Sequence, residues 1–365
     1  MAETKLKQQA VQPEFFNLSM ARQALNNGNF DIWQRGVTAT NILNGDYGSA
    51  DRWQQYVNAD GGTLPTSIVY SRQTLTSGDL PNSFYFYRVA PNGAGSSFGA
   101  GAYGITAQQI ENGVRYLCGL NKKVTVTFWA RSSIANKKFG IGMVLLYGSG
   151  GSPSADEFIN GKSWTLTTSW TKYTHTFTTN TLVGKTFGTN GDDRLNLYLG
   201  YAWGTGTFGT VLGSPGVAET FGGAGNIDIA QVQLCAGEVA LPFQPKSYGQ
   251  ELADCQRYYY RITGIDDSYT TLACGQNDNT QANTCVVPFP CVMRADPVPS
   301  FSSQGDFGVG VNGTVVAGTA IAENRSTRYA GRVTVSVASG LTQNAAGLIF
   351  FNNSSIAWIA WSAEL

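Results

Sequence analysis

The chain of 365 residues carries 24 basic and 24 acidic side chains, and charged residues make up 13% of it. This zero net charge argues against nucleic-acid binding, which depends on a basic surface that releases counterions. No apolar stretch of about 18 residues is long enough to cross a membrane, and the first residues lack the apolar region of a secretory signal peptide. We therefore expect a protein made in a cytoplasm, without membrane insertion.

Glycine is abundant, at 44 of 365 residues, where the average protein has about 7%. This composition predicts an all-β chain of many short strands joined by turns, and the length predicts two domains. The six cysteines show no C-x-x-C spacing and there is a single histidine, which makes a poor zinc set. We expect buried, reduced thiols; disulfides formed after release from a cell are the alternative.

Residues 1–26 are polar and lack the alternation of a strand, with a short helix expected over residues 19–25. The segment is too small to bury its own Phe15, Phe16 and Leu25, so we expect these side chains to pack on something else. Two interpretations stay open: a terminus that covers its own domain, or an anchor to the rest of a particle.

Residues 27–245 show the period of two that a sandwich of two sheets requires. Apolar side chains alternate with Trp129 and Arg131 over residues 124–131, and with Tyr198 over residues 195–203. Two glycine-rich segments, residues 91–104 and 204–226, are longer than most loops of compact domains and are expected to be functional or disordered.

Several of these strands, taken in order, resemble the jelly roll of carbohydrate-binding modules. The segments that carry the resemblance are ITAQQIE at 105–111, VTVTFWAR at 124–131, SWTKY at 169–173 and IDIA at 227–230. The resemblance implies a jelly-roll β-sandwich over residues 27–245 and permits sugar binding.

Residues 246–365 are expected to form a smaller C-terminal β domain, entered through prolines 242 and 245 and a short helix near residues 250–258. Asn312-Gly313 between two valine-rich segments predicts a hairpin, because a type I′ turn needs two residues with positive φ. The last segment, residues 356–361, is apolar on both faces. Trp358 and Trp361 have opposite parity, so one sheet face cannot hide both, and we expect them at an oligomer interface.

The junction IDIAQVQLCAG…PFQPKSYGQELADCQRYYYR at 227–261 resembles one found in tailed-bacteriophage structural proteins, mainly tail fibres and receptor-binding proteins. NGNFDIWQRG at 27–36, ADRW at 50–53, PFP…MRADP at 288–297 and the closing SAEL fit the same family. The resemblance implies a virion protein, assembled in the host cytoplasm, that is a homotrimer and contacts other virion proteins through its N-terminal segment.

The sequence offers little for catalysis. It has no G-x-S-x-G, P-loop or H-E-x-x-H motif, and its one histidine, His175, alternates with Tyr173 and Phe177 as a packed core residue would. Three adjacent carboxylate pairs, at residues 156–157, 192–193 and 266–267, are expected to be solvated turn residues rather than the separated pair of a glycosidase. We therefore expect no catalytic residues.

Asp31 and Asp228 lie where carbohydrate-module jelly rolls often place a structural calcium, but two acids supply few of the six to eight oxygens that calcium takes. No other cofactor is expected.

For sugar binding, the outward parity of two strands offers Trp129, Arg131 and Tyr198; packing of these residues against another subunit or a loop is the alternative. The sequence thus predicts a phage tail fibre or receptor-binding protein that attaches to host surface glycans without catalysis. A capsid decoration protein or head fibre is the alternative, and a glycan-degrading tailspike is a third.

Overall fold

The computed structural model describes residues 22–311, 313–323 and 325–365. The chain divides into two compact units, Met1–Ser247 and Tyr248–Leu365. Of the expected anchor segment, residues 1–26, and its helix, residues 1–21 lie outside the described residues. Among the residues described, no helix is long and apolar enough to cross a membrane.

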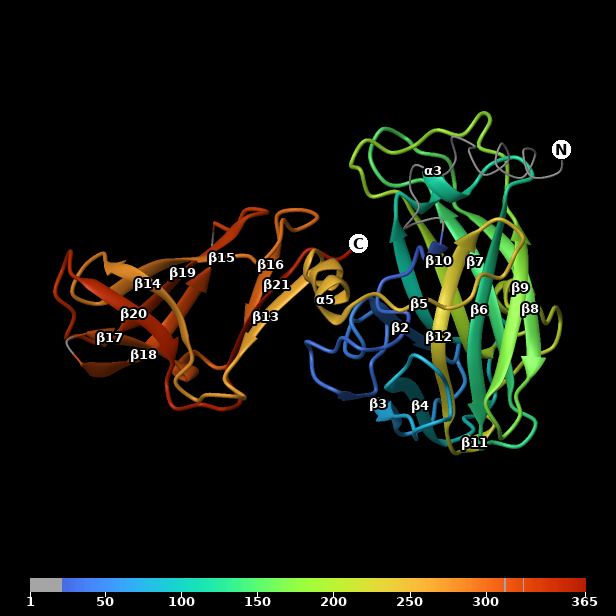
Figure 1. The fold of residues 1–365 in the computed structure, drawn as a ribbon, viewed down its shortest axis with the longest axis horizontal. Coiled ribbons are helices and arrows are strands. Elements are labelled where there is room, and N and C mark those ends of the chain that lie inside the picture. Colours follow the sequence, from blue (N-terminus) through green and yellow to red (C-terminus); the bar gives the residue numbers. More distant parts are fainter. Residues whose placement is uncertain (1–21, 312, 324) are drawn as a thin grey trace, which may run out of the picture. The chain divides into compact units, whose positions relative to one another are not determined.

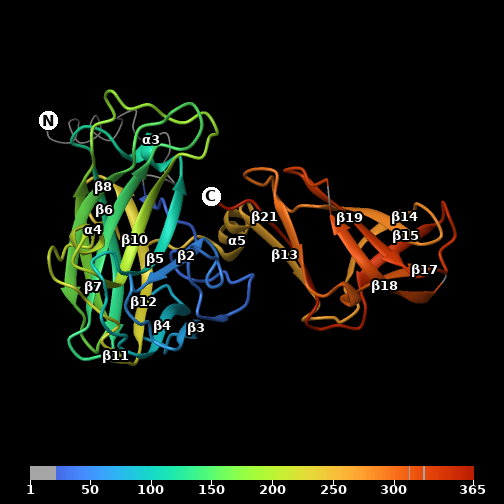
Figure 2. The same cartoon turned by 180° about the vertical axis from the view of Figure 1, so that it is seen from behind.

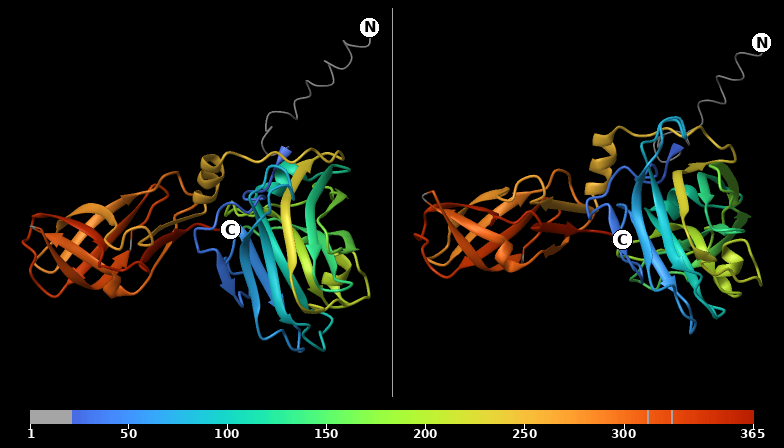
Figure 3. Two further views of the ribbon diagram at one scale, coloured as in Figure 1. Left: turned by 60° about the horizontal axis from the view of Figure 1, so that its bottom comes forward. Right: turned by 90° about the horizontal axis from the view of Figure 1, so that it is seen from below.

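The described part of unit 1 is a β-sandwich of two antiparallel sheets that lie face to face (Figures 1 and 3). Sheet A has the order β1-β3-β4-β12-β6-β9 with β11 paired to β4, and sheet B has the order β2-β5-β10-β7-β8. Sheet A consists of β1 (Thr38–Thr40), β3 (Ile68–Thr74), β4 (Tyr85–Gly93), β6 (Lys123–Ser132), β9 (Thr171–Thr178), β11 (Gly223–Ala224) and β12 (Ile227–Ala236). Sheet B consists of β2 (Trp53–Asn58), β5 (Tyr103–Glu111), β7 (Lys138–Leu146), β8 (Glu157–Thr165) and β10 (Arg194–Trp203). The expected all-β jelly-roll fold is confirmed.

The core of unit 1 lies between the sheets and follows from the alternation in each strand. Phe128 of β6 and Leu197 and Leu199 of β10 are fully buried there, because successive side chains of a strand point to opposite faces. Two short helices, α3 (Gly113–Leu117) and α4 (Thr207–Val211), lie in the connections that follow β5 and β10.

The segment just before the first strand belongs to this core. Leu25 and Phe30 are fully buried in it, and the backbone of Ala24 donates to Leu234 O of β12 at 2.9 Å. This burial favours, for residues 24–26, the interpretation as a cover of their own domain. An anchoring role for the residues before Arg22 stays a prediction.

Unit 2 combines a closed barrel with a small sheet, and these elements are shown from behind in Figure 2. The described barrel has the order β14-β15-β19-β18-β17-β20, and the sheet has the order β13-β21-β16. Val311 pairs with Thr314, as the predicted hairpin requires. The elements are α5 (Tyr248–Gln256), β13 (Tyr259–Thr263), β14 (Thr271–Asn277), β15 (Ala282–Pro288), β16 (Val298–Phe301), η2 (Gln304–Asp306), β17 (Phe307–Val311), β18 (Thr314–Glu323), β19 (Ala330–Val337), β20 (Ala346–Phe351) and β21 (Trp358–Ser362).

Candidate functional site

The three residues predicted to bind sugar lie on two different surfaces of the sandwich. Trp129 and Arg131 alternate with core residues of β6, so they point outward from sheet A. Tyr198 alternates with core leucines of β10 and points outward from sheet B. The two sheets enclose one core, so these outward faces are on opposite sides of unit 1, and the three side chains cannot form one site.

Arg131 belongs to a structural cluster on sheet A. Its Nε donates to Asp228 Oδ2 at 3.0 Å, and its guanidinium lies 4.6 Å from the ring centroid of Trp170. Arg88 donates to both oxygens of the same carboxylate, at 2.7 and 2.9 Å. Both oxygens of Asp228 are therefore engaged within the chain, and the Arg131 guanidinium is held in place by its Nε hydrogen bond and by the Trp170 ring.

The two acids weighed as calcium ligands have other partners. The Asp228 side chain is 4% exposed, and its carboxylate is bonded to two guanidinium groups. Asp31 accepts a hydrogen bond from Asn29 Nδ2 at 3.0 Å, and burial raises its pKa, against smaller opposing effects of Asn29 and Arg72. Within the described ranges, no group of three or more histidine, cysteine or acidic side chains is arranged to hold a metal ion.

The outward face of sheet B carries an aromatic cluster around Tyr198. Tyr56 of β2, Tyr103 of β5 and Phe208 of α4 join it, and each ring is half-buried. The Phe208 ring centroid lies 4.6 Å from that of Tyr103 and 6.4 Å from that of Tyr198. The sheet and the helix thus present four partly exposed aromatic rings on one surface.

Three amide side chains lie on the same face. Gln54, Gln109 and Asn196 are each at most 5% exposed. Gln109 Nε2 and the Tyr56 hydroxyl both donate to Gln54 Oε1, at 2.5 and 2.9 Å. Among the described residues, no donor reaches the buried acceptors Gln109 Oε1 and Asn196 Oδ1. A buried acceptor without a donor costs about 1–3 kcal/mol, so each is a place where a water or a ligand hydroxyl would stabilise the protein.

Charge near this face is mixed. Burial raises the pKa values of both Tyr56 and Tyr198; the positive charge of Arg194 at the start of β10 opposes this rise for both, and the negative charge of Asp156 adds to it for Tyr198. Burial raises the pKa of Tyr198 to about 12, so its hydroxyl keeps its proton at neutral pH. A tyrosine that stays neutral can both donate and accept hydrogen bonds, as recognition of hydroxyl groups requires.

The glycine-rich segment 204–226 covers part of this face, with α4 beside β7 and β8 (Figure 2). It approaches the sheet where the strands have glycine: a Cβ at Gly140 would lie 2.4 Å from Leu212 O, and one at Gly200 would lie 2.3 Å from Leu212 Cδ1. The sequence predicted that this loop is functional or disordered, without a specific role. In the structure the loop places Phe208 of α4 against Tyr103 on this face.

The sequence interpretation missed most of this site. Tyr56, Tyr103, Gln54, Gln109 and Asn196 lie on strands whose alternation is visible in the sequence, so their outward parity was accessible. What was not accessible is that β2, β5 and β10 are neighbours in one sheet.

The carboxylate pairs differ from the expectation of solvated turn residues. Asp193 is 2% exposed and pairs with Arg115 Nε at 2.9 Å. Burial raises the pKa of Glu157, but hydrogen bonds from Lys185, Asn180 and Tyr147 outweigh it and the pKa is lowered. The prediction was wrong for these two residues, because Asp193 forms an ion pair with Arg115 and Glu157 forms one with Lys185.

Two further expectations need correction. His175 is half-buried rather than a core residue; it packs edge-on against Phe177, with ring centroids 4.6 Å apart, and burial lowers its pKa. Of the cysteines, Cys118, Cys235, Cys255 and Cys285 are buried, but Cys274 is exposed, and no disulfide joins the described cysteines.

The two tryptophans of the closing strand have different environments within unit 2. Trp361 is fully buried, stacked 5.9 Å from Tyr260 and 5.1 Å from Phe289. Trp358 is half-buried beneath the Arg261 guanidinium. The prediction that Trp361 lies at an oligomer interface is therefore wrong, because unit 2 itself buries this side chain against Tyr260 and Phe289. Oligomerisation itself stays a prediction.

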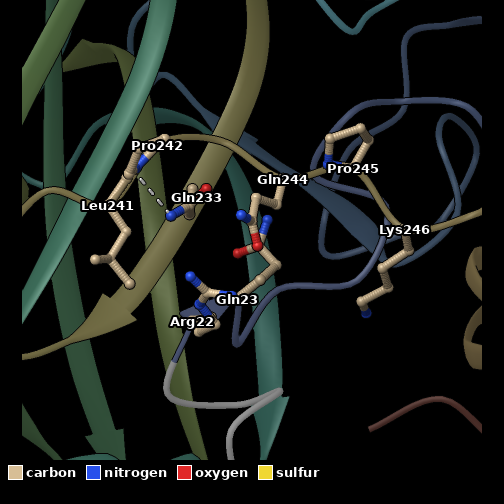
Figure 4. Close-up of a pocket in the computed structure, with 8 residues that line it drawn as sticks. All are labelled: Arg22, Gln23, Gln233, Leu241, Pro242, Gln244, Pro245 and Lys246. Carbon is tan, nitrogen blue, oxygen red and sulfur yellow. Dashed lines mark hydrogen bonds between the residues drawn. The ribbon is translucent and has the colours of Figure 1, made fainter. Parts of the chain in front are cut away.

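A separate pocket of about 310 Å³ lies where residues 22–23 meet the segment after β12 (Figure 4). Its described lining is Arg22, Gln23, Gln233, Leu241, Pro242, Gln244, Pro245 and Lys246. None of these side chains is aromatic, so the pocket lacks the flat apolar plane found on sheet B.

Comparison with known proteins gives structural likeness only. No protein-family model matches the sequence, and no curated protein matches it. Solved structures with a similar fold include sugar-binding domains and one phage tailspike domain. A putative sugar binding protein from Bacteroides thetaiotaomicron is 11% identical, with 59% of this chain and 100% of that chain covered and a TM-score of 0.34. The CBM22-2 xylan-binding domain of Paenibacillus barcinonensis Xyn10C is 14% identical over 55% and 98%, with a TM-score of 0.29. The enzymatically active domain of bacteriophage CBA120 tailspike protein 4 is 10% identical over 59% and 21%, with a TM-score of 0.29. At these identities the likeness concerns the fold alone.

Proposed function

We propose that this chain is a non-catalytic, glycan-binding protein of a tailed-bacteriophage virion, a tail fibre or receptor-binding protein that attaches to host surface glycans. The observation that carries glycan binding is the outward face of sheet B, where partly exposed aromatic rings surround buried amides with unused acceptors. The virion role is supported by the resemblance of the 227–261 junction to phage structural proteins.

In this proposal the aromatic rings contact the apolar face of a sugar ring, and the amides form hydrogen bonds with its hydroxyl groups. The apolar face of a sugar ring packs on Tyr56, Tyr198 or Phe208, whose ring faces are electron-rich and bury apolar surface. Both acceptors are buried in the free protein, so a sugar hydroxyl donates to Gln109 Oε1 or Asn196 Oδ1 only where binding shifts the side chains around them; such a bond removes the cost of a buried acceptor. Sites of this kind, largely apolar with a few placed polar groups, suit small ligands.

The test is direct binding of the full-length protein to host surface polysaccharide and to an oligosaccharide array. Tyr198→Ala should weaken binding about tenfold or more, since it removes a stacking ring at the centre of the face. Tyr116→Ala is the matched control, because Tyr116 is a 53% exposed tyrosine on α3 outside this face. Equal binding by both variants would overturn the assignment of the site.

The absence of catalysis is part of the proposal. Support comes from the candidate acids: burial raises the pKa of Asp192, but hydrogen bonds from Ser149 outweigh it and lower the pKa, which disfavours a general acid. The purified protein should release no reducing ends from host polysaccharide, and Asp192→Asn should change nothing. Depolymerisation that this substitution abolishes would favour the glycan-degrading tailspike instead.

We also propose a homotrimer, whose repeated sites would bind by avidity. The number three comes from the resemblance to phage structural proteins alone. Association itself is supported by an uncharged row on the barrel, in which Leu348 pairs with Gly310 and Gly310 with Val315; Leu348 and Val315 are 44% and 43% exposed. Light scattering should give a mass near three times 39.1 kDa, and Leu348→Lys should lower it. A stable monomer at micromolar concentration would refute the trimer.

Imaging virions with an antibody to this chain distinguishes a tail location from a capsid decoration protein or head fibre.

A further inference from the structure

The cover segment 204–226 has a single charged residue, Glu219. Apart from Asn226, the rest of the segment is made of glycine, proline, hydroxyl and apolar residues, so its attachment to the sandwich depends mostly on packing and backbone hydrogen bonds. Glu219 is therefore the one place where the segment can be held by a charge.

The partner of Glu219 is Lys137, in the turn between β6 and β7. The Lys137 side chain is 0% exposed, and its Nζ lies 2.6 Å from Glu219 Oε1 and 2.5 Å from Thr220 O. The backbone N–H of Lys138 also donates to Glu219 Oε1, at 3.2 Å. Three donor–acceptor contacts thus join this turn to residues 219–220 of the cover segment.

The same stretch is connected to the aromatic face. Trp203 and Glu219 exchange two backbone hydrogen bonds of 2.8 Å, and Trp203 Nε1 donates to Val217 O at 2.9 Å. In the chain, α4 lies between Trp203, the last residue of β10, and Glu219, and Phe208 of α4 packs on Tyr103. Residues 203–219 therefore form a loop that the Trp203–Glu219 pair closes, and Phe208 lies within this loop.

We propose that the Lys137–Glu219 ion pair positions the cover segment so that Phe208 completes the aromatic face for glycan binding. Lys137 and Glu219 are positioning residues that do not touch the glycan. Breaking one partner of a buried pair leaves the other charge unpaired, which strongly favours opening of the segment that carries it. This inference rests on the proposed glycan-binding function of sheet B.

The experiment is a double-mutant cycle in the full-length protein, with the array oligosaccharide that the wild-type protein binds as the probe. Glu219→Gln and Phe208→Ala should each weaken binding about tenfold, and the double variant should bind no worse than either single one, because Glu219 acts through Phe208. Lys137→Met repeats the measurement if Glu219→Gln folds poorly. Glu238→Gln, which breaks the exposed Lys123–Glu238 pair, should bind normally.

Limited thermolysin digestion gives an independent readout. Glu219→Gln should be cut within residues 204–226 under conditions that leave the wild type intact. Additive losses in the cycle, or normal glycan binding by Glu219→Gln, would overturn the positioning role while leaving the glycan site in place. A wild-type protein that binds no glycan would overturn the proposed function and this inference with it.

Discussion

Replacing Asp228 with asparagine is the sharpest test of how unit 1 is held together. The carboxylate accepts three hydrogen bonds from Arg88 and Arg131, at 2.7, 2.9 and 3.0 Å, and is 4% exposed. Hydrogen bonds to charged groups contribute about 1.5–3 kcal/mol each, so a plain sum would exceed 4 kcal/mol. The two arginine side chains, however, are 24% and 29% exposed and can regain water when the carboxylate is lost.

We therefore expect Asp228→Asn to destabilise unit 1 by about 3 kcal/mol, near the low end for breaking a buried pair. For a unit of this size that corresponds to a fall in Tm of roughly 6–12 °C. Calorimetry of the full chain measures the shift, and hydrogen exchange of peptides from β4, β6 and β12 assigns it to unit 1. Glu238→Gln, at an exposed pair just after β12, should give no resolvable shift.

A loss below about 1 kcal/mol would show that the arginines rehydrate fully and that the cluster is dispensable. Calcium provides a second check on the same residue. If millimolar calcium raised the Tm of the wild type and not of Asp228→Asn, the carboxylate would be a metal ligand and the arginine assignment would be refuted.

Three further predictions follow from burial. Burial lowers the pKa of Lys137 from 10.5 to about 8, against the opposing effect of Glu219, so the unfolded state binds more protons between these pH values. The free energy of unfolding of the wild type, relative to that of Lys137→Met, should therefore rise from pH 8 to 10.5 by at most about 3 kcal/mol. A difference between the two proteins that does not change with pH would contradict this. Trp361→Ala should cost unit 2 about 3–5 kcal/mol in urea denaturation, and Trp358→Ala clearly less, since only Trp361 is fully buried. A thiol reagent at pH 8 should label exposed Cys274 first, while Cys118 and Cys285, whose pKa values burial raises to about 12, should react only after unfolding.

The sequence by itself determined several of the strands and their two faces. The alternation over residues 124–131 and 195–203 agrees with β6 and β10 to within one residue at every strand end. The expected helix near 250–258 corresponds to α5. These features depend on neighbours one or two positions apart, which a sequence displays directly.

Only the tertiary structure decided which strands share a sheet and therefore which side chains share a surface. Parity places Trp129 and Tyr198 outward on their own strands, yet β6 belongs to sheet A and β10 to sheet B. The partners that determine the chemistry, Asp228 for Arg131 and Gln109 beside Asn196, are about 90 residues away in the chain. Pairing of strands is set by packing over the whole core, and local periodicity carries no information about it.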